Sequence, residues 1–337
     1  MKKILSDLYR NFVLYFKLYM LLLLVPLTYN FIPVNEGTKT FYISSSNIDD
    51  VVNTLKTNGY EVTWIDKLML KLRKTPEVGW YSVAPAEQGR LLFFQHLYQQ
   101  KTDELMDVVV YAGDTKEELI ARLANDMKLD QEKLLNTYHR LARFKEADIL
   151  AQRYTLARQA DENTTMQYIF YKSRQKLNTF VEEYFTTTPE LMELRIVHII
   201  ASIIQKESNS IEEMPLISSV IYNRLARGMR LQMDGTLNYG PYAHTIVTPE
   251  RIKSDESAYN TYKHKGLPPY PLSTVTLDAL KASMKPKESD YIFFMLNEDG
   301  SHNFTVTYDE HLENIRAFRK YQKEREKEKE TEFKARL

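Results

Sequence analysis

Residues 193–207 read ELRIVHIIASIIQKE. This stretch is apolar on almost every side of a helix, which predicts a helix buried in a protein core. The stretch ends at Glu207, so a carboxyl group lies at the end of a core element, where burial would raise its pKa and keep it protonated near neutral pH. We expect Thr188 to cap this helix and Pro189 to take its first position. The plain structural alternative is a solvated glutamate at a helix end.

The elements that follow predict an α+β fold. Residues 215–228 (PLISSVIYNRLARG) have the apolar spacing of a helix that ends at Gly228. A shorter helix is expected over residues 277–285. Residues 290–306 (DYIFFMLNEDGSHNFTV) predict two strands joined by the Asp299–Gly300 turn. We therefore expect a domain made of helices and one β-hairpin.

Two loops between these elements carry the groups that bind sugars. They are residues 229–240 (MRLQMDGTLNYG) and 257–273 (SAYNTYKHKGLPPYPLS). Sugar sites need amides and carboxylates for hydroxyl groups and aromatic faces for pyranose rings, and rigid turns hold such groups in place. From composition alone, a binding surface without chemistry is an equally good interpretation.

Four motifs in this region resemble one known family. They are ASIIQKE (201–207), VIYNRLARGMRLQMDGTLNYG (220–240), AYNTYKHKGLPP (258–269) and DGSHNFT (299–305). In order and spacing they are similar to the endolytic murein transglycosylases of the YceG/MltG-like family. The resemblance in sequence is close over residues 190–318. In the part of the chain before residue 190, only the order of the expected elements resembles the family.

The resemblance implies a lytic transglycosylase with no cofactor. Such an enzyme cleaves the β-1,4 bond between N-acetylmuramic acid and N-acetylglucosamine and leaves a 1,6-anhydro end, and the family's catalytic glutamate maps onto Glu207. The chain departs from the family at Gln205, where Glu is usual, at Gly235, where Pro is usual, and at PLSTVT (271–276), where Asn-Pro-Gly is usual. These departures leave the shape of the loops near residues 235 and 273 open.

We assign the other polar and aromatic residues of the region to substrate binding. The alternative for each is a hydrogen bond that shapes a loop, or packing at the edge of the core. The predicted substrate-binding residues are Asn223, Arg224, Gln232, Asp234, Thr236, Tyr239, Tyr259, Asn260, Tyr262, His302 and Phe304.

The N-terminal region predicts a membrane anchor. Residues 12–32 are 21 residues with the single charge Lys17, which is enough to span a bilayer core of about 30 Å. Lys2, Lys3 and Arg10 precede the span, so the positive-inside rule places residues 1–11 in the cytoplasm and the rest outside it. A cleaved signal peptide would need a small-residue cleavage site, which the following residues do not offer. A buried helix of a soluble protein is a third interpretation.

Residues 33–144 predict small α/β modules, which we interpret as LysM-like. In the first, residues 60–65 (YEVTWI) are expected to form a strand. In the second, Asp114 and Glu117 have the spacing of a capping box. Plain structural spacers are the alternative. Residues 145–187 predict a helical connector, 188–318 the catalytic domain, and 319–337 a charged helix or tail.

Composition excludes several classes of function. The 337 residues include 45 basic and 45 acidic side chains, so no overall positive field recruits nucleic acid. The chain has no cysteine, which rules out disulfides, thiolate nucleophiles and cysteine metal sites. Phosphate-binding glycine loops, a GxSxG motif and HExxH are absent from the sequence. The seven histidines do not fall in a compact metal-ligand spacing, so we expect no metal.

Three functions therefore compete. The first is a lytic transglycosylase of the cytoplasmic membrane that acts on glycan strands of nascent peptidoglycan outside the cytoplasm. The second is a membrane-anchored glycan-binding scaffold of the wall-synthesis machinery. The third is a hydrolytic muramidase, which would need a second carboxylate such as Asp234 to activate water. From the resemblance we also expect a partnership with peptidoglycan synthases.

Overall fold

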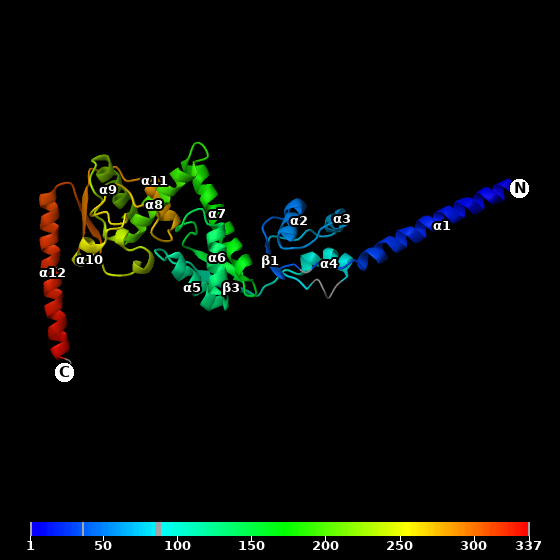
Figure 1. Ribbon diagram of the computed structural model, residues 1–337, viewed down its shortest axis with the longest axis horizontal. Coiled ribbons are helices and arrows are strands. Elements are labelled where there is room, and N and C mark those ends of the chain that lie inside the picture. The colour runs from blue at the N-terminus through cyan, green and yellow to red at the C-terminus, as the bar shows by residue number, and fades with distance from the viewer. Residues whose placement is uncertain (1, 36, 85–88, 336–337) are drawn as a thin grey trace. The chain divides into compact units, whose positions relative to one another are not determined.

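The computed structural model describes residues 2–35, 37–84 and 89–335, and it confirms a mixed α+β fold (Figure 1). The chain divides into two compact units. The first contains residues 1–106 and 155–165, and the second contains residues 107–154 and 166–337. The predicted boundaries at 144 and 187 are not tested by this division and stay predictions.

The first unit begins with α1 (Lys2–Asn30). Within the described residues, its segment Ser6–Asn30 is the one helix long and apolar enough to cross a membrane, with a mean hydropathy of 1.8. The expected span 12–32 thus falls almost wholly on this helix, and its last two residues follow the helix end. Glu36, the first charged residue after the span, lies outside the described residues.

A small α/β module follows in the same unit. Strands β1 (Thr40–Ile43) and β2 (Gly79–Ser82) pair antiparallel, and α2 (Ile48–Thr57), α3 (Trp64–Leu72) and α4 (Arg90–His96) complete it. A 3-10 turn (Leu97–Gln99) extends α4. Their buried apolar side chains form one core, which includes Phe41, Ile43, Val51, Leu55, Tyr60, Leu70, Tyr81, Phe93, Phe94 and Leu97.

The expected strand at residues 60–65 was wrong. Residues 61–63 have no regular secondary structure, and α3 starts at Trp64. Thr63 and Asp66 form a capping box, in which each side chain accepts the other residue's backbone N–H. Capping satisfies backbone groups at a helix start, so this pair outweighs the β-favouring residues around it.

Residues 105–157 hold a two-stranded sheet and two helices. Strand β3 (Leu105–Val109) pairs with β4 (Arg153–Ala157), and α5 (Lys116–Met127) and α6 (Gln131–Leu141) lie between them in sequence. The capping box of α5 is one residue later than predicted.

Thr115 and Glu118 form that box, not Asp114 and Glu117. The Asp114 carboxylate instead pairs with Arg122 on the same helix. The helical connector expected over residues 145–187 was wrong in its first part, because β4 occupies residues 153–157 and α7 (Glu162–Tyr184) begins only after it.

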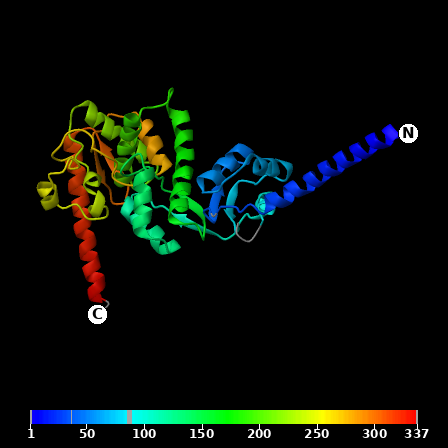
Figure 2. The same ribbon diagram turned by 45° about the vertical axis from the view of Figure 1, so that its right-hand side comes forward.

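The main core of the second unit lies among α8 (Leu191–Glu207), α9 (Met214–Ala226) and α11 (Leu277–Met284). These helices lie side by side in Figures 1 and 2. The predicted ends of α9 and α11 are confirmed, whereas α8 is capped by Glu190 and Glu193 and not by Thr188. The buried core residues of these helices include Val197, Ile199, Ile200, Ile203, Ile204, Ile217, Val220, Ile221, Ala279 and Leu280.

A hairpin and a long helix close this unit. Strands β5 (Phe293–Leu296) and β6 (His302–Thr305) pair antiparallel, as the sequence predicted. Helix α12 (Tyr308–Ala335) packs against both strands (Figure 2). It thus starts inside the segment assigned to the catalytic domain. The loops contain α10 (Pro249–Ser254) and 3-10 turns at Asp234–Leu237 and Gly240–Tyr242.

Candidate active site

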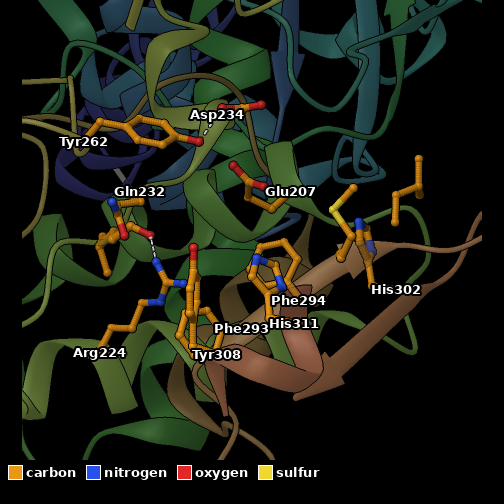
Figure 3. A pocket seen from close by; sticks show the side chains of 13 residues that line it. Glu207, Arg224, Gln232, Asp234, Tyr262, Phe293, Phe294, His302, Tyr308 and His311 are labelled. Carbon is orange, nitrogen blue, oxygen red and sulfur yellow. Dashed lines mark hydrogen bonds between the residues drawn. The ribbon is translucent and has the colours of Figure 1, made fainter. Parts of the chain in front are cut away.

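One cleft of the second unit, with a volume of about 380 Å³, lies at the end of α8 (Figure 3). Its walls come from the end of α8, from α9, from the loop after α9, from the β5–β6 hairpin and from the start of α12. The residues that line it are Glu207, Arg224, Leu231, Gln232, Asp234, Tyr262, Phe293, Phe294, Met295, Leu296, His302, Tyr308 and His311.

Glu207 lies at the centre of this cleft (Figure 3). Its Oε1 accepts a hydrogen bond from the backbone N–H of Gly235, with an N···O distance of 2.6 Å. Burial raises the pKa of Glu207 to about 7, the Gly235 hydrogen bond opposes this shift, the negative charge of Asp234 adds to it, and Arg224 lowers it. A carboxyl with such a pKa exchanges its proton near neutral pH and can serve as acid and as base.

The two residues before Glu207 hold the last turn of α8 in place. The Lys206 Nζ donates to the carbonyl oxygens of Gly113 (2.7 Å) and Ala243 (2.9 Å). The Gln205 Oε1 accepts hydrogen bonds from the backbone N–H (3.1 Å) and the hydroxyl (2.9 Å) of Thr276, which precedes α11. A neutral amide oxygen suffices for this role.

Asp234 and Tyr262 form a hydrogen-bonded pair on one wall. The Tyr262 hydroxyl donates to Asp234 Oδ1 at 2.7 Å. Burial, and then Asp234, raise the pKa of Tyr262 well above its usual range, so this hydroxyl stays protonated and able to donate. Gln232 lies beside them with a φ of 48°, a left-handed conformation in which its side chain lines the cleft.

Arg224 joins α9 to the hairpin. Its Nε donates to the carbonyl of Ile292 at 2.6 Å, and its Nη1 donates to the carbonyl of Leu231. The guanidinium also lies 5.3 Å from the ring centre of Phe293. Arg224 is therefore both a buried structural group and a positive charge that faces the cleft.

His302 is held by Glu213, which directly precedes α9. One carboxylate oxygen accepts the backbone N–H of His302 (2.6 Å), and the other lies 3.0 Å from the ring Nδ1. The imidazole meets Phe294 edge to face, with ring centres 5.3 Å apart. Both side chains of the pair are mostly buried, so the carboxylate fixes the orientation of the imidazole in the cleft wall.

The remaining predicted residues do not line the cleft. Asn260 and Thr236 are fully buried. The Asn260 amide donates to the carbonyls of Ile252 and Asp255, both at 2.8 Å. The Thr236 hydroxyl lies 2.9 Å from that of Thr261. The contacts of Asn260 and Thr236 therefore agree with the alternative interpretation, in which the side chain forms a hydrogen bond that shapes a loop.

Asn223, Tyr239, Tyr259 and Phe304 are half-buried. The Asn223 amide donates to two carbonyls of the segment before β5. Tyr239 and Tyr259 stack with ring centres 4.2 Å apart. Phe304 packs against Phe294, with ring centres 5.9 Å apart. Contacts of these four with a substrate stay predictions.

The sequence-based predictions did not include the apolar side of the cleft or the polar side chains of Tyr308 and His311. Tyr308 and His311 are three residues apart on α12, a spacing that places both on one face of a helix and that the sequence already contained. Gly235 and Glu213 could not be found in this way, because each acts through a contact between distant segments. The missed lining residues are Leu231, Phe293, Phe294, Met295, Leu296, Tyr308 and His311.

The structure also brings one histidine to two carboxylates. Potential ligand atoms of Asp114, Glu118 and His244 lie within 4.8 Å of one another, so linear spacing was a poor argument against a metal site. Arg122 pairs with Asp114, and His244 Nε2 lies 3.3 Å from Glu118. Arg122 thus pairs with Asp114 while His244 lies against Glu118, and we assign the group to a network of polar contacts.

The fold and the site define a mixed α+β protein with an anchor-length apolar helix and a half-buried carboxyl in an open, polar and aromatic cleft. A sequence model of the YceG-like family matches residues 41–317. The chain belongs to the YceG-like family.

Characterised relatives match only part of the chain. The endolytic murein transglycosylase of Bacillus subtilis (strain 168) is 32% identical over 155 residues, which cover 45% of this chain and 42% of the relative. That of Streptococcus pneumoniae (strain D39) is 29% identical over 161 residues, or 46% of this chain and 29% of the relative. The matched stretch spans less than half the length of either relative.

A solved structure supports the fold. The crystal structure of a YceG-like protein from Listeria monocytogenes has a TM-score of 0.52 and 22% identity, and it covers 83% of this chain and 99% of that one. At this identity the likeness concerns the fold alone.

Proposed function

We propose that this protein is an endolytic lytic transglycosylase that cuts the glycan strands of peptidoglycan, with Glu207 as its single acid and base. The observation that carries the proposal is the carboxyl of Glu207 in the cleft, with a pKa raised to about 7 by burial. The relatives named endolytic murein transglycosylase supply the substrate class.

The proposed reaction has two proton transfers. Protonated Glu207 gives its proton to the oxygen of the bond between N-acetylmuramic acid and N-acetylglucosamine, and the bond from C1 to that oxygen breaks. The resulting Glu207 carboxylate takes the proton of the C6 hydroxyl of N-acetylmuramic acid, and the C6 oxygen attacks C1 of the same sugar. The product has a 1,6-anhydro end, and no water is consumed.

The rest of the cleft suits a saccharide. Asp234, Tyr262 and Gln232 offer acceptors and donors for hydroxyl and acetamido groups, while Phe293 and Phe294 supply aromatic faces. Arg224 and the fixed imidazole of His302 complete the polar wall. An intramolecular attack needs no bound nucleophile, which fits a cleft whose polar groups are mostly amides, hydroxyls and rings.

A hydrolytic muramidase is the second candidate function, because Asp234 places a second carboxylate in the same cleft. Asp234 accepts the hydroxyl of Tyr262. As a base it would have to activate a water molecule beside the sugar. The scaffold interpretation differs from both, because it predicts glycan binding without new strand ends.

We also propose that α1 is a retained anchor with its N-terminus in the cytoplasm and the cleft outside. The last turn of α1 is part of the folded first unit. The Tyr29 hydroxyl donates to Asp66 Oδ1 at 2.5 Å, and the Asn30 side-chain oxygen accepts the backbone N–H of Leu91 at 3.1 Å. Cleavage near this point would remove buried contacts. Partnership with peptidoglycan synthases stays a prediction.

The test is digestion of purified peptidoglycan by the full chain in detergent, beside Glu207→Gln, with the products resolved by mass spectrometry. Muropeptides lighter by one water, present with wild type and absent with the variant, are expected. Hydrated reducing ends would mean a muramidase. Binding without any cleavage by folded wild-type protein would favour the scaffold.

A further inference from the structure

We propose that α3 lies in the surface of the membrane that α1 anchors, with its apolar face between the lipid headgroups and the upper acyl chains. This inference rests on the proposed anchor, because it requires α1 to span that membrane. It goes beyond the anchor, because it gives the first unit a second membrane contact that depends on other residues.

Helix α3 has two faces of different character. Asp66 and Leu70 are buried in the module. The other face carries Trp64, Leu68 and Leu72, which follow one another at intervals of four residues, a spacing that places them on one side of a helix. They are 75%, 41% and 67% exposed. Large apolar side chains that are aligned and exposed in this way indicate a surface that binds a membrane or another protein.

The start of α3 is fastened to the last turn of α1. The Tyr29 hydroxyl donates to Asp66 Oδ1 at 2.5 Å and lies 2.7 Å from the hydroxyl of Thr63, the cap of α3. Tyr29 belongs to the predicted span 12–32. The outer end of the predicted span therefore touches the first turn of α3, so a membrane around α1 reaches this helix.

Exposed apolar side chains beside this junction extend the same surface. Phe31 and Ile32 follow α1 directly, and Leu92 lies on α4, and all three are exposed. Helix α4 packs against both α1 and α3, and both module helices lie at the end of the module where α1 joins it (Figure 1). Contact with lipid would remove this apolar surface from water, which is favourable.

The charges of α3 favour a lipid surface over a protein partner. The segment 64–74 (WIDKLMLKLRK) contains one acid, Asp66, which is buried and paired with Arg90. Its basic residues are Lys67, Lys71, Arg73 and Lys74. Tryptophan and leucine on one face with lysine and arginine beside them are typical of helices that lie in a membrane interface. Tryptophan prefers the level of the headgroups, and basic side chains attract anionic lipids.

Two of the basic residues are the more important for this contact. Lys67 and Lys74 each pair with an acid of the module. Lys71 and Arg73 are exposed and adjoin the apolar face in sequence. We therefore expect these two to bind anionic headgroups. With α3 in the interface, the first unit is attached to the membrane at two points and cannot swing freely about the end of α1.

The two tryptophans of the chain provide a direct test. Trp64 is exposed on α3, whereas Trp80 is buried in the module. The full chain is reconstituted in vesicles that contain anionic phospholipid, with or without bromine near the headgroup end of the acyl chains, because bromine quenches tryptophan fluorescence on contact. The emission of Trp64 is the difference between wild type and Trp64→Phe.

We expect bromine to remove about half of the Trp64 emission, because side chains of interfacial helices lie roughly 5–10 Å into the boundary between headgroups and acyl chains. The Trp80 emission, measured in Trp64→Phe, should change little. Trp64 emission that stays unquenched and typical of water would overturn the inference and leave this face to a protein partner.

Flotation of the same vesicles at alkaline pH separates this inference from the proposed anchor. Protein that floats with the vesicles while Trp64 is unquenched would retain the anchor and refute the contact of α3. Protein that separates from the vesicles would refute both. Neither measurement depends on whether the protein cuts peptidoglycan.

A charge-reversal variant tests the role of anionic lipid. Lys71→Glu combined with Arg73→Glu should lower the quenching of Trp64 to the level found in purely zwitterionic vesicles, because the attraction to the headgroups becomes repulsion. Lys133→Glu combined with Lys265→Glu makes the same change of net charge at exposed positions of the second unit and should leave the quenching unchanged. Equal quenching in both double variants would overturn the proposed contact with anionic headgroups.

Discussion

At the scale of single residues, Glu207 should make the protein's stability depend on pH. Its folded pKa of about 7 is above the usual value of 4.5, so the folded state holds a proton that the unfolded state releases between these values. Stability contributed by this group is full below about pH 4.5 and is lost as the pH rises through 7.

At pH 8, Glu207→Gln should therefore be more stable than wild type by a free energy of unfolding on the order of 1–3 kcal/mol, and it should unfold at a higher temperature. At pH 4.5 the stabilities of the two proteins should be nearly equal. Thermal unfolding at the two pH values measures this. Glu146 also has a pKa raised to about 7 by burial, but it is common to both proteins and cancels. A variant less stable than wild type at pH 8 would contradict the buried-acid assignment.

Glu213 should matter through His302. Glu213→Ala leaves the backbone N–H and the Nδ1 of His302 without their acceptor, so the imidazole loses its orientation in the cleft wall. We expect cutting to fall by about 10- to 100-fold, mainly in kcat, since misplaced groups cost this much. The exposed neighbour Glu212 offers a matched control, because Glu212→Ala should leave the rate unchanged. Similar rates for both variants would show that the pair is only structural.

At the scale of elements, the hairpin depends on α9 for its position. The Asn223 amide donates to the carbonyls of Ser289 (2.7 Å) and Tyr291 (2.9 Å), just before β5. Asn223→Ala should destabilise the second unit by about 1–3 kcal/mol, because two carbonyls lose their donor. Chemical denaturation measures the loss, and Asn303→Ala, at an exposed asparagine on β6, should have little effect. A change in substrate binding without loss of stability would instead favour the predicted role of Asn223 in binding.

Element types were predictable where one local signal dominated. The period of α9, its end at Gly228 and the hairpin turn at Asp299–Gly300 all agree with the sequence-based expectation. Residues 60–65 were misassigned because β-favouring side chains surround a capping pair, Thr63 and Asp66. Helix caps need only two residues and a favourable backbone, so a weak β pattern does not override them.

At the scale of the whole molecule, the apolar helix α1 and the rest of the first unit should fold together. Asp66 and Arg90 form a fully buried ion pair (2.7 Å), and the Tyr29 hydroxyl at the end of α1 completes it. Asp66→Ala should destabilise the first unit by about 3–5 kcal/mol, because it leaves the Arg90 charge buried without a partner. Asp49→Ala removes only an exposed partner of Lys67 and is the control.

The same contacts predict that α1 is not removed from the mature protein by proteolytic cleavage. The protein should remain in membranes after alkaline extraction and should keep α1, because removing α1 would expose Asp66 and Arg90. Fractionation and intact-mass measurement test this. A soluble product that begins near residue 33 and unfolds cooperatively would support the signal-peptide interpretation instead.

The sequence by itself determined α8, α9, α11 and the β5–β6 hairpin, the apolar span and the position of Glu207. These follow from hydrophobic period, turn residues and the motifs shared with one family, all of which are local in the chain. It also grouped Gln232, Asp234, Tyr262 and His302 as site residues, and all four line the cleft.

Only the tertiary structure decided which polar groups face the cleft and which shape its walls. Asn260 and Thr236 have the same chemistry as Gln232 and Asp234, yet they are fully buried in loop contacts. The hydrogen bond from Gly235 to Glu207 and the pairing of Glu213 with His302 join segments 28 and 89 residues apart. Such contacts, and the pKa that burial sets, depend on how distant segments pack, and no local pattern of residues contains that information.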